Sequence, residues 1–133
     1  MTSDGALLGG VYGRGAVAVQ VSDDAFVQAM LDVEAALARA CAAEGLIPSS
    51  SAEQIVAACS LARLDLGGLA DETAAGATPV IGLVRALRVA VGADARAHVH
   101  LGATSQDVVD TALMLVARRA LAPLLRDARA AAD

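Results

Sequence analysis

The sequence contains no tryptophan and no lysine, and only one phenylalanine and one tyrosine among its 133 residues. All ten basic residues are therefore arginines, they form no basic run, and the formal net charge is −5. Proteins that bind nucleic acid usually present a basic patch, so no nucleic-acid partner is expected. The shortage of aromatic side chains limits the apolar area that one small core can bury. We therefore expect helices that pack closely on other helices, including helices of other subunits.

Long apolar runs and secretory features are also missing. Arg85 and Arg88 interrupt one candidate membrane span, and the pair Arg118-Arg119 interrupts the other. The first residues show no basic region followed by an apolar core, so no signal peptide is evident. The only two cysteines, Cys41 and Cys59, fall inside helical patterns, which favours buried thiols over a disulfide or a metal site. We expect a cytoplasmic protein with no membrane partner and no metal.

The residues that are abundant favour an all-α fold. Alanine, valine and leucine supply most of the 56% of hydrophobic residues, and alanine is the strongest helix former. No sustained strand pattern occurs. We divide the chain into a flexible N-terminal arm over residues 1–21, a helical domain over residues 22–103, and a third part over residues 104–133. This third part is the start of a long helix.

The glycines of the N-terminal arm do not form a nucleotide-binding loop. A dinucleotide fingerprint needs a strand before its glycines and a helix after them, whereas alternating valines follow the glycines of residues 9–15. We interpret residues 1–21 as a flexible arm.

Capping residues divide the helical domain into several predicted helices. Ser22, followed by two aspartates, predicts a helix start, and Gly45 followed by Pro48 predicts its end. Shorter helices are expected to about residue 61 and over residues 66–75. Thr78 as N-cap and Pro79 at the first helical position predict the helix over residues 79–91.

The first of these helices has an apolar stripe at spacings of four and three, formed by Phe26, Met30, Val33, Leu37 and Ala40. Two acidic residues, Asp32 and Glu34, lie off this stripe. We expect both carboxylates to face solvent.

The stretch from His98 to Asp107 is a polar, glycine-containing loop that opens onto the longest helical pattern. Thr104 or Ser105 is a suitable N-cap, because a hydroxyl can accept a hydrogen bond from the first turn. Free N–H groups, two hydroxyls and an amide at a helix start form a ready anion site. Any function of this chain is expected here.

The last helix is apolar on more than one side, which predicts burial on more than one side. Its N-terminus is expected between Thr104 and Asp107, and its C-terminus within a few residues of the chain end. We expect self-association through its main apolar face, formed by Val109, Leu113, Val116, Ala120 and Leu124.

Four separated motifs carry a resemblance to the aspartase/fumarase superfamily, and within it to the 3-carboxy-cis,cis-muconate cycloisomerases. The stretch 100–112, HLGATSQDVVDTA, resembles the first signature region of the superfamily. Residues 28–40, 45–48 and 79–87 are similar to the cycloisomerases in order and spacing. The likeness extends from about residue 22 to about residue 120.

The resemblance implies a fold, a reaction and a set of site residues. Family members are all-α homotetramers that need no cofactor, and each active site combines signature regions from three subunits. The cycloisomerases close a lactone in the protocatechuate branch of the β-ketoadipate pathway, acting on a small polycarboxylate. In this chain the resemblance assigns substrate binding to Thr78, Gly102, Thr104, Ser105 and Gln106. His100 is either a proton donor or substrate ligand, or a structural histidine.

Other interpretations stay open. Two later signature regions of the family do not occur in these 133 residues, so we expect the chain to be inactive alone, with the main acid and base elsewhere. Thr78 stands where adenylosuccinate lyases carry a catalytic histidine and cycloisomerases usually carry asparagine. The alternatives are another lyase of the superfamily, such as a relative of adenylosuccinate lyase, and a helical assembly module without activity.

Overall fold

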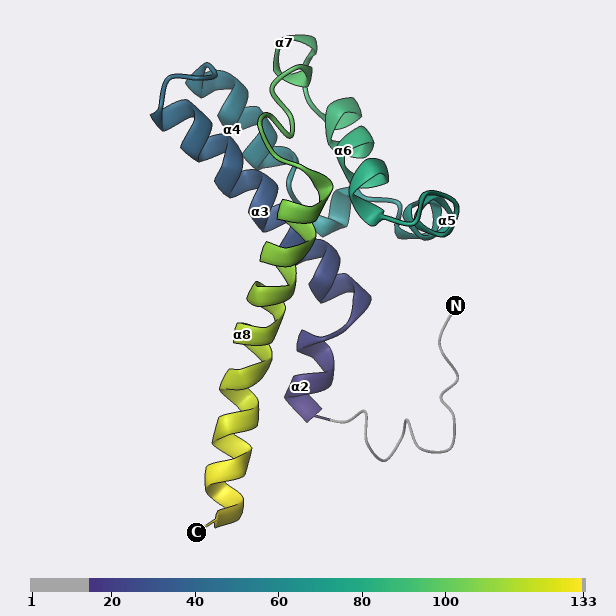
Figure 1. Ribbon diagram of the computed structural model, residues 1–133. Helices are drawn as coiled ribbons and strands as arrows, with labels where there is room; N and C mark the ends of the chain where they lie inside the picture. Colours follow the sequence, from purple (N-terminus) through teal and green to yellow (C-terminus); the bar gives the residue numbers. More distant parts are fainter. Residues whose placement is uncertain (1–14, 133) are drawn as a thin grey trace.

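The computed structural model describes residues 15–132, and in these residues the regular structure is entirely helical (Figure 1). The elements run in the order α2 (Gly15–Gln20), α3 (Asp23–Ala43), α4 (Ser49–Ala58), the 3-10 turn η1 (Leu61–Arg63), α5 (Leu66–Gly76), α6 (Pro79–Ala90), α7 (Ala93–Arg96) and α8 (Ser105–Ala132). This confirms the all-α prediction.

The ends of α3 follow from its capping residues. The Ser22 hydroxyl accepts a hydrogen bond from the backbone N–H of Ala25 at 3.2 Å, as the sequence predicts. At the other end Gly45 adopts φ +72°, and Leu46 N–H donates to the Cys41 carbonyl at 2.8 Å. This left-handed glycine and the bond that crosses it satisfy carbonyls that the helix end would leave free.

Helix α3 is the centre of the fold, with α4 and α8 packed against it and α5 packed against α6. The core is almost wholly aliphatic, and its largest fully buried side chains include Met30, Leu31, Ile55, Leu83 and Leu87. In Figure 1 the first turns of α8 lie within the group formed by α3, α4 and α6, and the rest of α8 projects away from that group with α2 alongside.

The buried face of α3 differs from the predicted stripe. Met30 is fully buried, but Ala40 is exposed, and the face turned to the core contains Leu31, Ala35, Ala38 and Cys41. Small alanines on this face allow two helices to approach α3 closely. The stripe predicted from the large side chains therefore lies on a different part of the helix surface from the face that packs.

The expectation that Glu34 faces solvent is wrong. Its side chain lies on the packed face of α3 and is 1% exposed. Asp32 is half-buried and accepts hydrogen bonds from Arg119 of α8 at 2.6 Å and from Gln28 at 2.9 Å. Both acidic residues therefore connect α3 to other parts of the chain.

The N-terminal arm is helical where the structure describes it. Gly15–Gln20 form α2, which contacts α8, and the flexible arm expected over residues 1–21 stays a prediction. Its alternating valines indicated no helix by themselves, and packing against α8 outweighs that local pattern. Residues 1–14 lie outside the described part of the chain.

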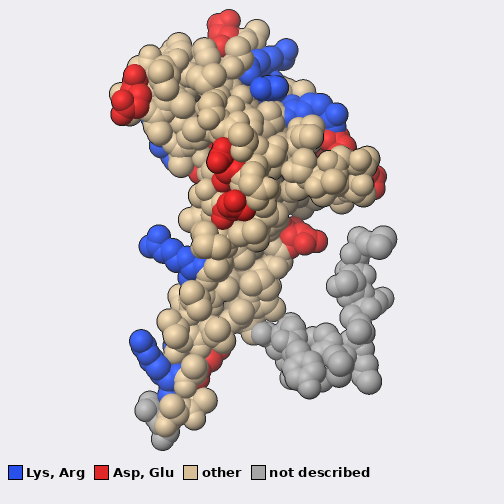
Figure 2. All heavy atoms as spheres, in the orientation of Figure 1, with Lys and Arg blue, Asp and Glu red and all other residues tan. Residues whose placement is uncertain are grey.

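Helix α8 runs through 28 residues without interruption and confirms the predicted start and end. The predicted association face is partly used inside the chain, because Val116 is only 9% exposed and belongs to the core. Two members of the predicted face, Leu113 and Leu124, are exposed, and so are three further apolar side chains of α8: Met114, Leu121 and Leu125. Figure 2 shows the projecting part of α8 as a largely uncharged surface with arginines along one edge.

Among the described residues, no helix is both long enough and apolar enough to cross a membrane.

Candidate functional site

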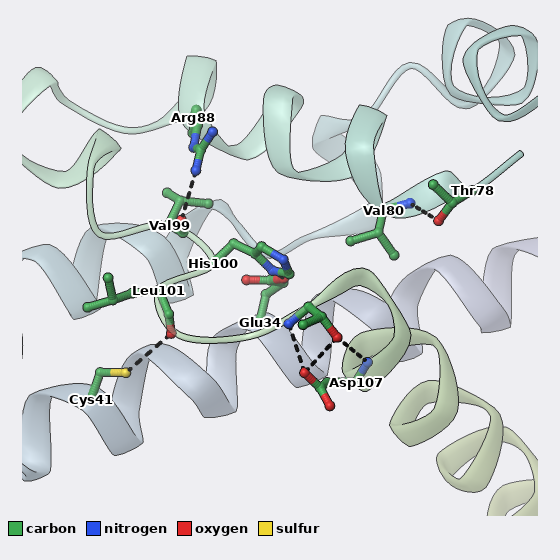
Figure 3. A network of polar contacts seen from close by, with 10 residues as sticks. Glu34, Cys41, Thr78, Val80, Arg88, Val99, His100, Leu101 and Asp107 are labelled. Carbon is green, nitrogen blue, oxygen red and sulfur yellow. Dashed lines mark hydrogen bonds and ion pairs between the residues drawn. The ribbon is translucent and has the colours of Figure 1, made fainter. Parts of the chain in front are cut away.

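The loop between α7 and α8 is fixed by contacts with two other helices. His100 adopts φ +62° and Gly102 φ +78°, so two residues of this short loop have left-handed backbone. A positive φ is uncommon for a residue other than glycine and often occurs at functional sites. Arg88 of α6 donates to the Val99 carbonyl at 3.4 Å, and the Cys41 thiol of α3 lies 3.9 Å from the Leu101 carbonyl oxygen (Figure 3).

The side chain of His100 points toward α3 and meets the buried Glu34 (Figure 3). The distance from His100 Nδ1 to Glu34 Oε1 is 2.6 Å. This pair joins the loop to the centre of the fold across 66 positions of sequence. The other carboxylate oxygen, Oε2, is buried and has no hydrogen-bond partner among the described residues.

The N-terminus of α8 is closed by a reciprocal cap. Asp107 Oδ2 accepts hydrogen bonds from the backbone N–H and the hydroxyl of Thr104, both at 2.8 Å. In return Asp107 N–H donates to Thr104 Oγ1 at 3.3 Å. The backbone N–H of Thr104, and then its hydroxyl, lower the pKa of Asp107. Both donors of Thr104 are thus engaged by Asp107, which confirms the capping role predicted for Thr104.

We predict that Thr104→Ala destabilises the chain by about 1 kcal/mol at pH 7, the usual cost of losing an N-cap. Because the folded-state pKa of Asp107 is below its unfolded value, its contribution is present above about pH 4 and is lost as the pH falls further. The difference between the variant and the natural sequence should therefore shrink at pH 3. Urea unfolding followed by circular dichroism at both pH values measures it.

A matched control is Thr111→Ala, an exposed threonine further along the same helix. It should be at least as stable as the natural sequence at both pH values, because alanine favours a helix interior more than threonine does. Equal stability of Thr104→Ala and Thr111→Ala at pH 7 would contradict the capping role.

A pocket of about 350 Å³ opens beside the loop. Its polar lining comes from Arg85 and Arg88 of α6, His100 of the loop and Ser105 at the start of α8, and its apolar lining comes from Val80, Ile81 and Val84. Arg85 pairs with Glu72 of α5, whereas Arg88 forms no ion pair within the described residues. Figure 2 shows arginine side chains gathered over α6 and α7. The Arg88 guanidinium, the imidazole and the hydroxyl suit a small anion with carboxylate groups.

The structure brings two of the predicted site residues together in this pocket, His100 and Ser105. The Ser105 hydroxyl forms no hydrogen bond with any other described residue, so it can donate to a ligand. Thr78 caps α6 by accepting a bond from Val80 N–H at 3.4 Å and does not line the pocket.

The remaining predicted residues also lie outside the pocket lining. Gln106 Nε2 donates to Asp110 Oδ1 at 2.6 Å on the exposed side of α8. Gly102 adopts φ +78°, so it serves the left-handed turn of the loop, and a Cβ atom added there would meet no protein atom within 4 Å. The substrate-binding roles given to Thr78, Gly102, Thr104 and Gln106 stay predictions.

Sequence reasoning missed Arg85, Arg88 and Glu34. A signal for the arginines was present, because Ile81, Arg85 and Arg88 follow each other at spacings of four and three and so share one helix face. No comparable signal marked Glu34, whose burial depends on how α8 and the loop pack on α3.

Cys59 lies near the buried Glu34 carboxylate, and its environment does not activate the thiol. Burial, and then the nearby Glu34 carboxylate, raise the pKa of the Cys59 thiol to about 12, so this cysteine is unreactive near neutral pH. Within residues 15–132 no group of three or more histidine, cysteine, aspartate or glutamate side chains is placed to hold a metal ion.

Known proteins share this sequence and this fold. A family model described as "Lyase" matches residues 14–131. A nitrosuccinate lyase of Streptomyces davaonensis is 47% identical over 120 residues, which cover 88% of this chain and 25% of that protein. A 3-carboxy-cis,cis-muconate cycloisomerase of Pseudomonas putida is 50% identical over 103 residues, covering 75% and 24%.

The solved structures agree with the sequence relatives. The crystal structure of 3-carboxy-cis,cis-muconate lactonizing enzyme from Pseudomonas putida superposes with a TM-score of 0.86 at 44% identity, over 91% of this chain and 28% of that one. The chain therefore spans about a quarter of the length of these relatives.

Proposed function

We propose that this chain, which belongs to the lyase family within the aspartase/fumarase superfamily, forms part of an active site. This part binds the carboxylate groups of a small polycarboxylate. The reaction that we propose is the lactonisation of a 3-carboxymuconate-like substrate in the β-ketoadipate pathway, in the cytoplasm. The similarity to several cycloisomerases supports this choice. The observation that carries it is the pocket that joins Arg88, His100 and Ser105.

The chemistry explains why donors of this kind are needed. One substrate carboxylate oxygen adds across a carbon–carbon double bond, and the neighbouring carbon takes up a proton. Negative charge develops on another carboxylate while that carbon is carbanion-like. Fixed donors aimed at this charge lower the barrier, and neither oxidation nor a metal is required. Arg88 and Ser105 would hold a carboxylate of the substrate, and His100 would contact the same group.

The same pocket suits a second reaction of the superfamily. The nitrosuccinate lyase matches a larger part of this chain than the cycloisomerase from Pseudomonas putida does. A lyase acting on a substituted succinate would use the same carboxylate-binding groups, because elimination and addition develop charge at the same position. Tighter binding of succinates than of tricarboxylates would favour this alternative.

Assembly is part of the proposal. The resemblance implies a homotetramer whose active sites combine segments of several subunits, and the exposed apolar side of α8 offers a surface for such an assembly. A helical module that assembles without binding any carboxylate is the competing possibility.

We predict that the chain binds tricarballylate, a saturated tricarboxylate, and that Arg88→Ala weakens this binding at least about tenfold. Hydrogen bonds to charged groups contribute about 1.5–3 kcal/mol, and about 1.4 kcal/mol corresponds to a factor of ten. Isothermal titration calorimetry at low ionic strength measures the affinities.

Arg96→Ala provides the matched control, because Arg96 is an exposed arginine of α7 outside the pocket lining. It should bind tricarballylate like the natural sequence. Equal weakening by both substitutions would indicate a general charge effect and would contradict a specific site.

A further inference from the structure

Burying the Glu34 carboxylate costs folding free energy. A carboxylate that is 1% exposed loses nearly all its hydration, and burying a charge is costly unless it is paired and hydrogen-bonded. Replacing a buried ion pair by apolar side chains of similar volume is often neutral or stabilising. Packing of α3 against α8 therefore does not by itself require a glutamate here.

The contact between Glu34 and His100 determines which ring nitrogen stays free for a ligand. An ionised Glu34 Oε1 can only accept a hydrogen bond, and we therefore assign the proton of this contact to His100 Nδ1, 2.6 Å away. His100 also lines the pocket with Arg88 and Ser105. Since Nδ1 is engaged, the ring atom left for a ligand is Nε2, which forms no hydrogen bond with any described residue.

Neutral His100 with its proton on Nδ1 presents a lone pair at Nε2, which repels a carboxylate. Doubly protonated His100 presents an N–H there and attracts one, while its positive charge is balanced by Glu34. The other charged groups facing this position are Arg85 and Arg88 from α6 and Asp107 from α8.

We propose that Glu34 is a positioning residue: it fixes His100 with Nδ1 protonated and Nε2 toward the pocket, so that binding of a carboxylate is coupled to uptake of a proton at Nε2. The proton comes from solvent, and no covalent bond to carbon changes. This inference rests on the proposed function, because it assigns a carboxylate to the pocket. According to this proposal, ligand binding favours protonation of His100, and protonation of His100 favours ligand binding.

Two measurements on the natural sequence test the proposal. Nitrogen-15 NMR reports the protonation of each imidazole nitrogen, and the chain has only two histidines, so His98 serves as an internal reference. Calorimetric titration with tricarballylate at pH 8, in buffers of different ionisation enthalpy, gives the number of protons taken up.

We expect His100 to carry its proton on Nδ1 without ligand and on both nitrogens with ligand, and a net uptake of up to one proton per ligand. Glu34→Gln should abolish most of this uptake and weaken binding about tenfold. Glu53→Gln makes the same change at an exposed glutamate of α4 and should leave both quantities unchanged.

The possible outcomes distinguish the role of Glu34 from the proposed function. Binding without proton uptake, or a His100 protonated on Nε2 alone, would overturn the role of Glu34 and leave the proposed function standing. Unchanged uptake in folded Glu34→Gln would also overturn it. No binding of tricarballylate at all would defeat the proposed function as well. If Glu34→Gln fails to fold, the two measurements on the natural sequence still decide.

Discussion

Replacing both Leu121 and Leu124 by aspartate is expected to convert a self-associating chain into a monomer. Both side chains are about half exposed on the projecting part of α8. They belong to a series of exposed positions spaced alternately by three and four residues: Met114, Ala117, Leu121, Leu124 and Ala128. This spacing is the heptad pattern by which one helix packs along another.

The expected effect is large because the two substitutions place charge at the centre of the apolar series. Fully burying a leucine side chain contributes about 1.5–3 kcal/mol, so completing the burial of each half-exposed leucine contributes roughly 1 kcal/mol. Burying an unpaired aspartate instead adds a penalty. We expect the apparent Kd of association to rise at least about 100-fold, which corresponds to about 3 kcal/mol. Sedimentation equilibrium at several concentrations measures it.

The control and the choice of position follow from the structure. Val89→Asp changes a side chain on α6 that is 74% exposed and should leave association unchanged. Val116 is unsuitable for this test, because it lies in the core of the chain and its replacement would unfold the protein. A natural sequence that remains monomeric at all concentrations would contradict association through α8.

We also predict that the 133-residue chain shows no cycloisomerase turnover above buffer. The pocket holds donors for a carboxylate, but the resemblance places further signature regions of the active site outside this sequence. General acid–base groups typically contribute factors of about 10² to 10⁴ to the rate, and their combined absence leaves nothing to measure. An ultraviolet assay that follows loss of the conjugated diene of 3-carboxy-cis,cis-muconate tests this.

Tricarballylate binding to the same preparation is the control, because it shows that the carboxylate pocket is intact while catalysis is absent. Robust turnover by the pure chain would refute the prediction. The catalytic acid and base would then have to lie among the 133 residues, with His100 as the first candidate.

The parts of the fold that were predictable are those that local chemistry determines. Ser22, Gly45, Thr78 and Thr104 act at helix ends, where a hydroxyl or a left-handed glycine satisfies backbone groups within a few residues. Such caps can therefore be predicted from a single sequence.

The parts that were not predictable depend on contacts between distant segments. Glu34 was expected in solvent, and it is buried because the loop carrying His100 returns to α3 across 66 positions. Val116 was assigned to an association face, and it belongs to the chain's own core instead. Arg85 and Arg88 enter the candidate site only because α6 packs beside that loop.

A crystal structure of the chain with tricarballylate tests the central claim most directly. We predict a ligand carboxylate between the Arg88 guanidinium and the Ser105 hydroxyl, with hydrogen bonds of ~3 Å to both and to His100 Nε2. A ligand that leaves all three side chains untouched and binds elsewhere, for instance between α5 and α6, would contradict the assignment of this pocket as the carboxylate-binding site.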